Sequence, residues 1–152
     1  NLVGADGHLG ELIEVIDDLP ADLAREVAVL RLAEVEPGGA EEAGAVGLEF
    51  AGESWHSLCE RIVARLPQQV YVSFDIDGLT PQYCPHTGTP VPGGLTFDEA
   101  VYLLSRVVAS GRRIVGFDLC EVAPAPSGDD EWDANVGARM LYKLCLFALS
   151  SE

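Results

Sequence analysis

The stretch VYVSFDIDG, residues 70–78, decides the fold that this sequence of 152 residues predicts. Residues 70–74 form a short apolar run rich in β-branched and aromatic side chains, which is typical of a strand buried in a parallel sheet. The run ends in Asp75-Ile76-Asp77-Gly78. Open α/β sheets bind their ligands at the carboxyl ends of the strands. We therefore expect a ligand site directly after this strand.

Helical and strand patterns alternate along the chain around this stretch. Apolar residues recur at helical spacing over 54–66, and Pro67 ends that helix. Thr96 and Glu99 fit a capping box, and Gly111 fits the end of the same helix. We expect strands at 26–35 and 113–119, a last helix over 132–149, short helical pieces within 9–25 and loops at 36–48 and 78–95. This order predicts an α/β fold, a three-layer αβα arrangement with a mainly parallel sheet, in a single domain over 1–152.

The composition excludes several classes of partner. The net charge is −16, from 9 Lys and Arg against 25 Asp and Glu, so the chain should repel nucleic acid and anionic membrane surfaces. No signal peptide and no apolar run of about 20 residues occurs, so we expect no membrane partner. The 4 cysteines are widely spaced and form no CxxC motif, which favours reduced thiols in the cytoplasm.

Asp75 and Asp77 are the first candidate site residues. On a strand, residues two apart point to the same side, so both carboxylates should leave the sheet edge together. Two like charges held this close need neutralisation, and carboxylate oxygens suit Mg²⁺ or Mn²⁺. The alternative is a pair of solvated loop aspartates.

Two further segments should reach the same edge. The proline- and glycine-rich loop 78–95 is typical of a binding surface, and Thr87 and Thr89 can offer hydroxyls to a substrate or to a metal-bound water. Glu121 follows the strand at 113–119 and can bind a cationic group, with a surface or helix-capping role as the alternative. Asp118 lies within that strand, which favours an internal structural hydrogen bond.

These motifs together resemble a known family. SFDIDGL at 73–79, Pro81 and PHTGTPVPGGL at 85–95 resemble the third signature of the ureohydrolases, the arginase and agmatinase family, which runs SFDIDxxDP, a spacer, then TGTPxxGGL. GFDLCEV at 116–122 is similar to a later family segment, and WDANVGAR at 132–139 looks closest to bacterial agmatinase-like proteins. The resemblance covers residues 52–150 and implies the C-terminal portion of an arginase-like fold.

The resemblance implies manganese-dependent hydrolysis of an agmatine- or arginine-like guanidino compound to urea and an amine. In such enzymes a hydroxide that bridges two Mn²⁺ ions attacks the guanidinium carbon. Asp75 resembles the carboxylate that bridges the two ions, and Asp77 resembles a ligand of one of them. Thr89 is similar to the threonine that orients the guanidino group, and Glu121 to the glutamate that pairs with it.

His86 is a further candidate in the loop, two residues after Cys84. Near a metal site a histidine can shuttle protons or contact the substrate. The alternative is an exposed loop histidine. His56 lies on the predicted helix at 54–66, where we expect a structural or exposed position.

The sequence also departs from the family pattern. Thr80 stands where the pattern has Asp, and the GGDHS and DAHxD motifs that supply the remaining metal ligands are absent; Asp6-Gly7-His8 lacks the second Asp of the latter. The start at Asn1 suggests a piece of a longer protein. The chain is then part of an active enzyme that takes a small guanidino substrate and associates with a missing N-terminal portion or with its own copies. The alternatives are a truncated, catalytically incomplete relative acting as a binding or assembly module, and an unrelated divalent-metal enzyme that shares only the DxD.

Overall fold

The structure is a computed structural model that describes residues 27–32, 54–90 and 92–152. Its elements, in chain order, are β1 (Val27–Leu32), α2 (Trp55–Arg65), β2 (Gln69–Asp75), the 3₁₀ turn η1 (Ile76–Gly78), α3 (Phe97–Ala109), β3 (Arg113–Cys120) and α4 (Trp132–Ser150). The predicted alternation of strands and helices is confirmed. The helical pieces expected within 9–25 and the loop expected at 36–48 lie outside the described residues.

The sheet has the order β1-β2-β3, and both pairings are parallel. The α/β fold with a parallel sheet is therefore confirmed. Between β2 and β3 the register shifts by one residue, because Val70 pairs with Ile114 and Tyr71 pairs with Gly116. Beyond this irregularity the register runs to Asp75 opposite Cys120, so β2 and β3 end side by side.

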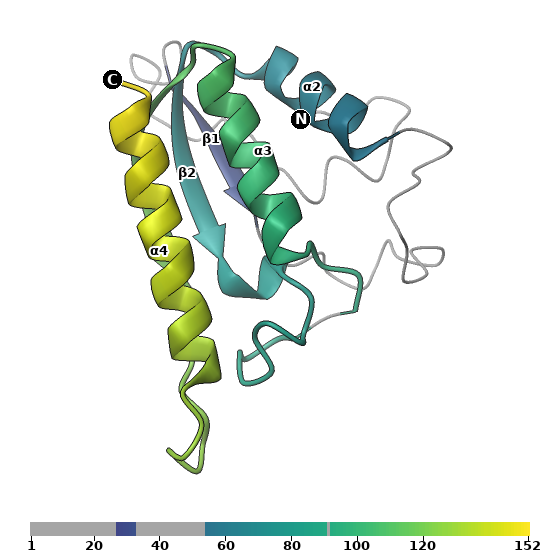
Figure 1. Cartoon of the computed structure of the whole chain (residues 1–152), viewed down its shortest axis with the longest axis vertical. Helices are drawn as coiled ribbons and strands as arrows, with labels where there is room; N and C mark the ends of the chain where they lie inside the picture. Colours follow the sequence, from purple (N-terminus) through teal and green to yellow (C-terminus); the bar gives the residue numbers. More distant parts are fainter. Residues whose placement is uncertain (1–26, 33–53, 91) are drawn as a thin grey trace.

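The core lies between the sheet and the helices. Val70, Val72 and Phe74 alternate along β2 and are buried in one apolar cluster with residues of α3 and α4. In Figure 1, α3 and α4 cover one face of the sheet, and α2 packs beside α3. The described residues thus supply the sheet and one helical layer of the α/β fold. None of the helices among them combines the length and apolar character that crossing a membrane requires.

The helix ends follow the predicted local rules. The Ser54 side chain caps α2 by accepting from the backbone of Ser57. Thr96 and Glu99 form the predicted capping box at the start of α3. Gly111 follows α3 with a φ of +81°, a conformation that glycine adopts without steric cost.

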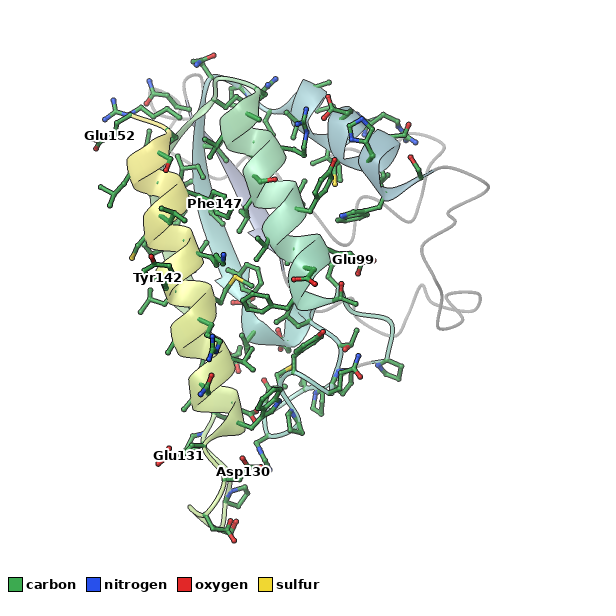
Figure 2. All side chains as sticks on the ribbon, in the orientation of Figure 1. Glu99, Asp130, Glu131, Tyr142, Phe147 and Glu152 are labelled. Atoms are coloured by element: carbon green, nitrogen blue, oxygen red, sulfur yellow. The ribbon has the colours of Figure 1, made fainter. Side chains whose placement is uncertain are left out.

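The last helix, α4, is apolar on two sides. Val136, Met140 and Leu144 face the core, as predicted. The opposite side carries exposed apolar residues, which are Leu141, Tyr142, Leu146 and Leu149. Figure 2 shows Tyr142 on the outer flank of α4, away from the sheet, whereas Phe147 lies between α4 and α3.

The loop after β2 is closed at its base. The backbone of Leu95 donates to Gly78, and the backbone of Thr80 donates to Leu95, both at 2.9 Å. Leu79, Cys84 and Leu95 are buried, so the loop has an apolar interior. A closed loop of this kind holds its residues in fixed positions beside the strand end.

Gly94 is the residue that permits this closure. A Cβ on Gly94 would lie 2.5 Å from the carbonyl carbon of Leu79 and 2.6 Å from its oxygen. Both are backbone atoms that cannot turn away. Gly94→Ala should therefore lower the free energy of unfolding by about 2–3 kcal/mol. Urea denaturation followed by circular dichroism measures this loss.

Gly88 is the matched control in the same loop. A Cβ on Gly88 would meet nothing within 4 Å. Gly88→Ala should change the free energy of unfolding by no more than about 0.5 kcal/mol. Equal losses from the two substitutions would show that the close contact at Gly94 is not what closes the loop.

Candidate functional site

Asp75 and Asp77 lie together at the carboxyl end of β2. Asp75 is the last residue of the strand and is 8% exposed, and Asp77 is 3% exposed. The expectation that both lie on a strand is wrong for Asp77, because Ile76–Gly78 forms the 3₁₀ turn η1. The turn brings the two carboxylates to the same end of β2 by a different backbone path.

Thr89 connects the loop to this pair. Its hydroxyl donates a hydrogen bond to Oδ2 of Asp77 at 2.9 Å. The predicted neighbourhood of Thr89 and Asp77 is therefore present. This bond helps to fix the carboxylate of Asp77, and Thr89 itself is exposed.

Glu121 is the first residue after β3 and is exposed. Its φ of 63° is the one positive value among non-glycine residues in the part of the chain that the structure describes. A left-handed conformation is costly for a residue with a Cβ. The Thr87 hydroxyl donates to the Glu121 carbonyl at 3.1 Å and so helps to hold this conformation.

Thr87 itself was expected to offer its hydroxyl to a substrate or to bound water. The structure buries Thr87 at 5% exposure and uses the hydroxyl for the bond to Glu121. That expectation is therefore corrected, because the hydroxyl points into the protein. Thr87 ties the loop to the end of β3.

The ends of β2 and β3 place Asp75 and Glu121 near each other. Cys120 pairs with Asp75 in the sheet and precedes Glu121 in the chain. Burial raises the pKa of the Cys120 thiol, and the charge and hydrogen bond of Asp118 and then the charges of Asp75 and Glu121 raise it further. Three carboxylates therefore act on one thiol at this sheet edge.

Asp118 has the structural role that the sequence predicted. Its carboxylate accepts from the Tyr71 hydroxyl at 3.1 Å and from the Ser73 hydroxyl at 3.0 Å. These bonds join β2 to β3 just before both strands end. Asp118 thus holds together the two strands that carry Asp75 and Glu121.

His86 is not an exposed loop histidine. Its Nδ1 lies 2.9 Å from Oδ1 of Asp133, and its backbone N–H donates to Oδ2 of the same carboxylate at 2.9 Å. The side chains of His86 and Asp133 are 25% and 1% exposed. The sequence did not point to Asp133, because an acidic residue in the first turn of a helix is ordinary. His56 bonds to the Tyr102 hydroxyl on the exposed side of α2, as expected.

Thr80 marks the departure from the family pattern. Its backbone joins the loop base, but its buried hydroxyl has no hydrogen-bond partner among the described residues. The side chain therefore contributes no hydrogen bond to the loop, whose base is held by backbone bonds.

The described residues include ligands of the type that a divalent cation prefers, but too few of them to complete a metal site. Asp75 and Asp77 offer oxygen ligands, which suit Mn²⁺ or Mg²⁺. No group of three or more His, Cys, Asp or Glu residues that could hold a metal ion occurs within 27–32, 54–90 and 92–152. Two carboxylates are one part of a metal site, which needs further ligands to close.

All four cysteines are free thiols, as predicted. Burial raises the pKa of Cys59 to about 12 and that of Cys84 to about 11, from an ordinary value of 9.0. The charge of Glu60 adds to the shift of Cys59, and the charges of Asp133 and Asp77 add to that of Cys84.

Because these thiols have raised pKa values, we expect the free energy of unfolding to fall at alkaline pH. A thiol with a raised pKa stabilises the fold fully below pH 9, and this contribution is lost as the pH rises toward 11–12, because only the unfolded thiol ionises in that range. Urea midpoints at pH 8 and pH 10.5 measure the loss. Cys84→Ala should reduce the dependence on pH, whereas Cys145→Ala, at an exposed site, should leave it unchanged. A Cys84→Ala variant with the unaltered dependence would contradict this assignment.

Comparison with known proteins agrees with the motifs. The Arginase family model matches residues 48–147. Arginase-1 of Homo sapiens is 28% identical over 144 residues, covering 88% of this chain and 44% of that protein. The agmatinase of Cronobacter sakazakii is 49% identical over 71 residues, 47% of this chain and 22% of that protein. The chain thus spans less than half the length of these relatives.

A solved structure shows the same fold. The proclavaminate amidino hydrolase from Streptomyces clavuligerus matches with a TM-score of 0.57 and 32% identity. The match covers 68% of this chain and 34% of that one.

Proposed function

Because this chain belongs to the arginase family, we propose that it supplies part of the active site of a manganese-dependent ureohydrolase, which releases urea from a small guanidino compound. The observation that supports the proposal is the pairing of Asp75, the last residue of β2, with Cys120, which precedes Glu121; Asp77 lies in the turn directly after β2. The closed loop carries Thr89 to the same place. Carboxylates in this arrangement suit a metal cation and a cationic substrate together.

Each residue has a role that follows from its position. Asp75 and Asp77, buried at the strand end, would hold the metal. Glu121, exposed at the end of β3, would accept two hydrogen bonds from the guanidinium ion, which pairs well with a carboxylate because both groups are planar. Thr89 fixes Asp77 and lies where it can help to orient the guanidino group.

Manganese ions bound at this site would lower the pKa of water and fix its position against the guanidinium carbon. A divalent cation held by Asp75 and Asp77 would offset the repulsion between their like charges. The other ligands would come from outside the described residues, because no group of three or more His, Cys, Asp or Glu residues that could hold a metal ion occurs among these.

Manganese analysis separates this proposal from its main alternative, a catalytically incomplete relative that serves as a binding or assembly module. The chain should be compared alone and in a completed enzyme, in which an N-terminal fragment of a family member supplies the GGDHS and DAHxD motifs. We expect near-stoichiometric Mn²⁺ only in the completed enzyme. If the completed enzyme binds no more Mn²⁺ than the chain alone, the binding-module alternative is favoured.

The surface of α4 favours an associated state. The exposed apolar residues Leu141, Tyr142, Leu146 and Leu149 lie along its outer side, and burying them would be favourable. We therefore expect the chain to associate with an N-terminal portion or with its own copies.

Four free thiols favour a reducing compartment such as the cytoplasm.

A further inference from the structure

His86 and Asp133 form a buried pair beside the site that the roles above leave unused. Asp133 lies in the first turn of α4, 47 residues along the chain from His86. Its carboxylate accepts from the backbone N–H of His86 and lies 2.9 Å from the ring Nδ1. We propose that Asp133 is a positioning residue, which holds His86 so that Nε2 accepts a hydrogen bond from the amine end of the substrate. The substrate part of this inference rests on the proposed function.

The burial of Asp133 determines which ring nitrogen carries a hydrogen. A carboxylate that is 1% exposed needs hydrogen-bond donors, because an unpaired charge away from water is costly. A ring nitrogen without hydrogen would repel the carboxylate oxygen 2.9 Å away. His86 therefore keeps a hydrogen on Nδ1, which donates to the carboxylate of Asp133.

Nε2 faces away from the buried carboxylate. The side chain of His86 is 25% exposed, although Nδ1 is turned to a residue that is almost fully buried. Nε2 lies on the other side of the ring from Nδ1 and forms no hydrogen bond with any of the described residues. In the neutral ring, such a nitrogen is an acceptor.

The pair lies close to the candidate metal carboxylates. His86 is three residues from Thr89, and three extended residues span about 10 Å at most. Thr89 in turn bonds to Asp77 at 2.9 Å. The buried Cys84 thiol supports this placement, because the charges of both Asp133 and Asp77 raise its pKa, after burial itself.

The charges around His86 favour an amine over a carboxylate. Asp133 is in contact with the ring. Asp129 lies near it, since the pKa of its carboxyl is lowered mainly by hydrogen bonds from Ser127 and its own backbone, and to a smaller extent by His86. Asp130 and Glu131 lie at the same end of α4 (Figure 2). A substrate with an amine or ammonium at the end away from the guanidino group therefore fits, whereas one with a carboxylate there would be repelled.

The first test measures the ring tautomer in this chain alone. Long-range proton–nitrogen NMR at about pH 8, where an ordinary histidine is neutral, separates the two tautomers. We expect hydrogen on Nδ1 and none on Nε2 of His86, with the signal assigned by its loss in His86→Ala. Asp129→Asn should leave the tautomer unchanged, and Asp133→Asn should alter it. Hydrogen on Nε2 in the unmodified chain would overturn the inference.

The second test measures whether His86 binds the amine end of the substrate. In the completed enzyme, His86→Ala should lower kcat/KM for agmatine about tenfold or more, mainly through KM. The value for 4-guanidinobutyrate, which carries a carboxylate in place of the amine, should not fall. Equal losses on both substrates would refute the recognition role. The tautomer of His86 can be measured without any hydrolysis. An error about the His86–Asp133 pair therefore appears in the NMR test, whereas an error about the proposed function appears as a lack of urea release.

Discussion

Asp75→Asn is expected to abolish urea release by the completed enzyme, with a loss of more than about 100-fold. Partners that only support a metal ligand typically cost about 10- to 100-fold when they are changed, and Asp75 is proposed as a ligand itself. Asparagine keeps the shape of the side chain but removes the charge that would bridge two cations. Urea should be measured together with the Mn²⁺ content, which should fall in parallel.

Asp98→Asn is the matched control for this experiment. Asp98 is an exposed acid in the first turn of α3 and takes no part in the site. Its replacement should leave both urea release and Mn²⁺ content unchanged. Full activity of Asp75→Asn would refute the bridging role, whereas a loss of folding, seen by circular dichroism, would indicate a structural one.

Glu121→Gln should lower kcat/KM by about 100-fold or more. Removing one partner of a buried, hydrogen-bonded charge pair, which Glu121 would form with a bound guanidinium ion, costs about 2–5 kcal/mol, and each 1.4 kcal/mol is a factor of ten. The amide of glutamine cannot accept two hydrogen bonds from a guanidinium ion as a carboxylate does. Glu152→Gln, at the exposed end of the chain, is the control and should have no effect. Unchanged kinetics in Glu121→Gln would remove Glu121 from the substrate site.

Glu121→Gly should have opposite effects on stability and activity. The φ of 63° at Glu121 is strained for any residue with a Cβ, and glycine relieves that strain. Relief of the strain raises the free energy of unfolding, whereas the greater flexibility of glycine in the unfolded chain lowers it. We expect a net rise of up to about 1 kcal/mol. Urea denaturation measures the gain, and urea release should be lost. A less stable Glu121→Gly variant would show that the conformation is not strained.

Local signals predicted the elements of this fold well. The apolar run at 70–74 became the central strand β2, since a fully buried parallel strand has little choice of residues. The capping box of Thr96 and Glu99 and the helix end at Gly111 depend on residues within a few positions of each other. Patterns of this range can be read from a sequence, because the contacts that produce them are local.

The path of the chain after β2 was less predictable. A strand and a 3₁₀ turn differ in backbone conformation but not clearly in the residues Asp75-Ile76-Asp77. The position of Asp77 was therefore right and its local structure wrong. The burial of one side of the loop was likewise not predicted, because prolines and glycines dominate its composition. Leu79 and Cys84, which are buried, are the residues that could have indicated it.

Contacts between distant segments could not be predicted. Asp133 meets His86 across 47 residues and Thr87 meets Glu121 across 34. Each of these residues has an ordinary local explanation, a helix N-terminus or a polar loop. Only the packing of α4 and the loop against the ends of the strands brings them together.

Urea release from agmatine by the completed enzyme in the presence of Mn²⁺ tests the central claim most directly. We expect urea when this chain is combined with the GGDHS and DAHxD motifs, and none from either part alone. The Asp75→Asn variant in the same mixture should be inactive. If the mixture binds Mn²⁺ but releases no urea from agmatine, arginine or 4-guanidinobutyrate, or if Asp75→Asn releases as much as the unmodified chain, the assignment of this sheet edge as a ureohydrolase site is contradicted.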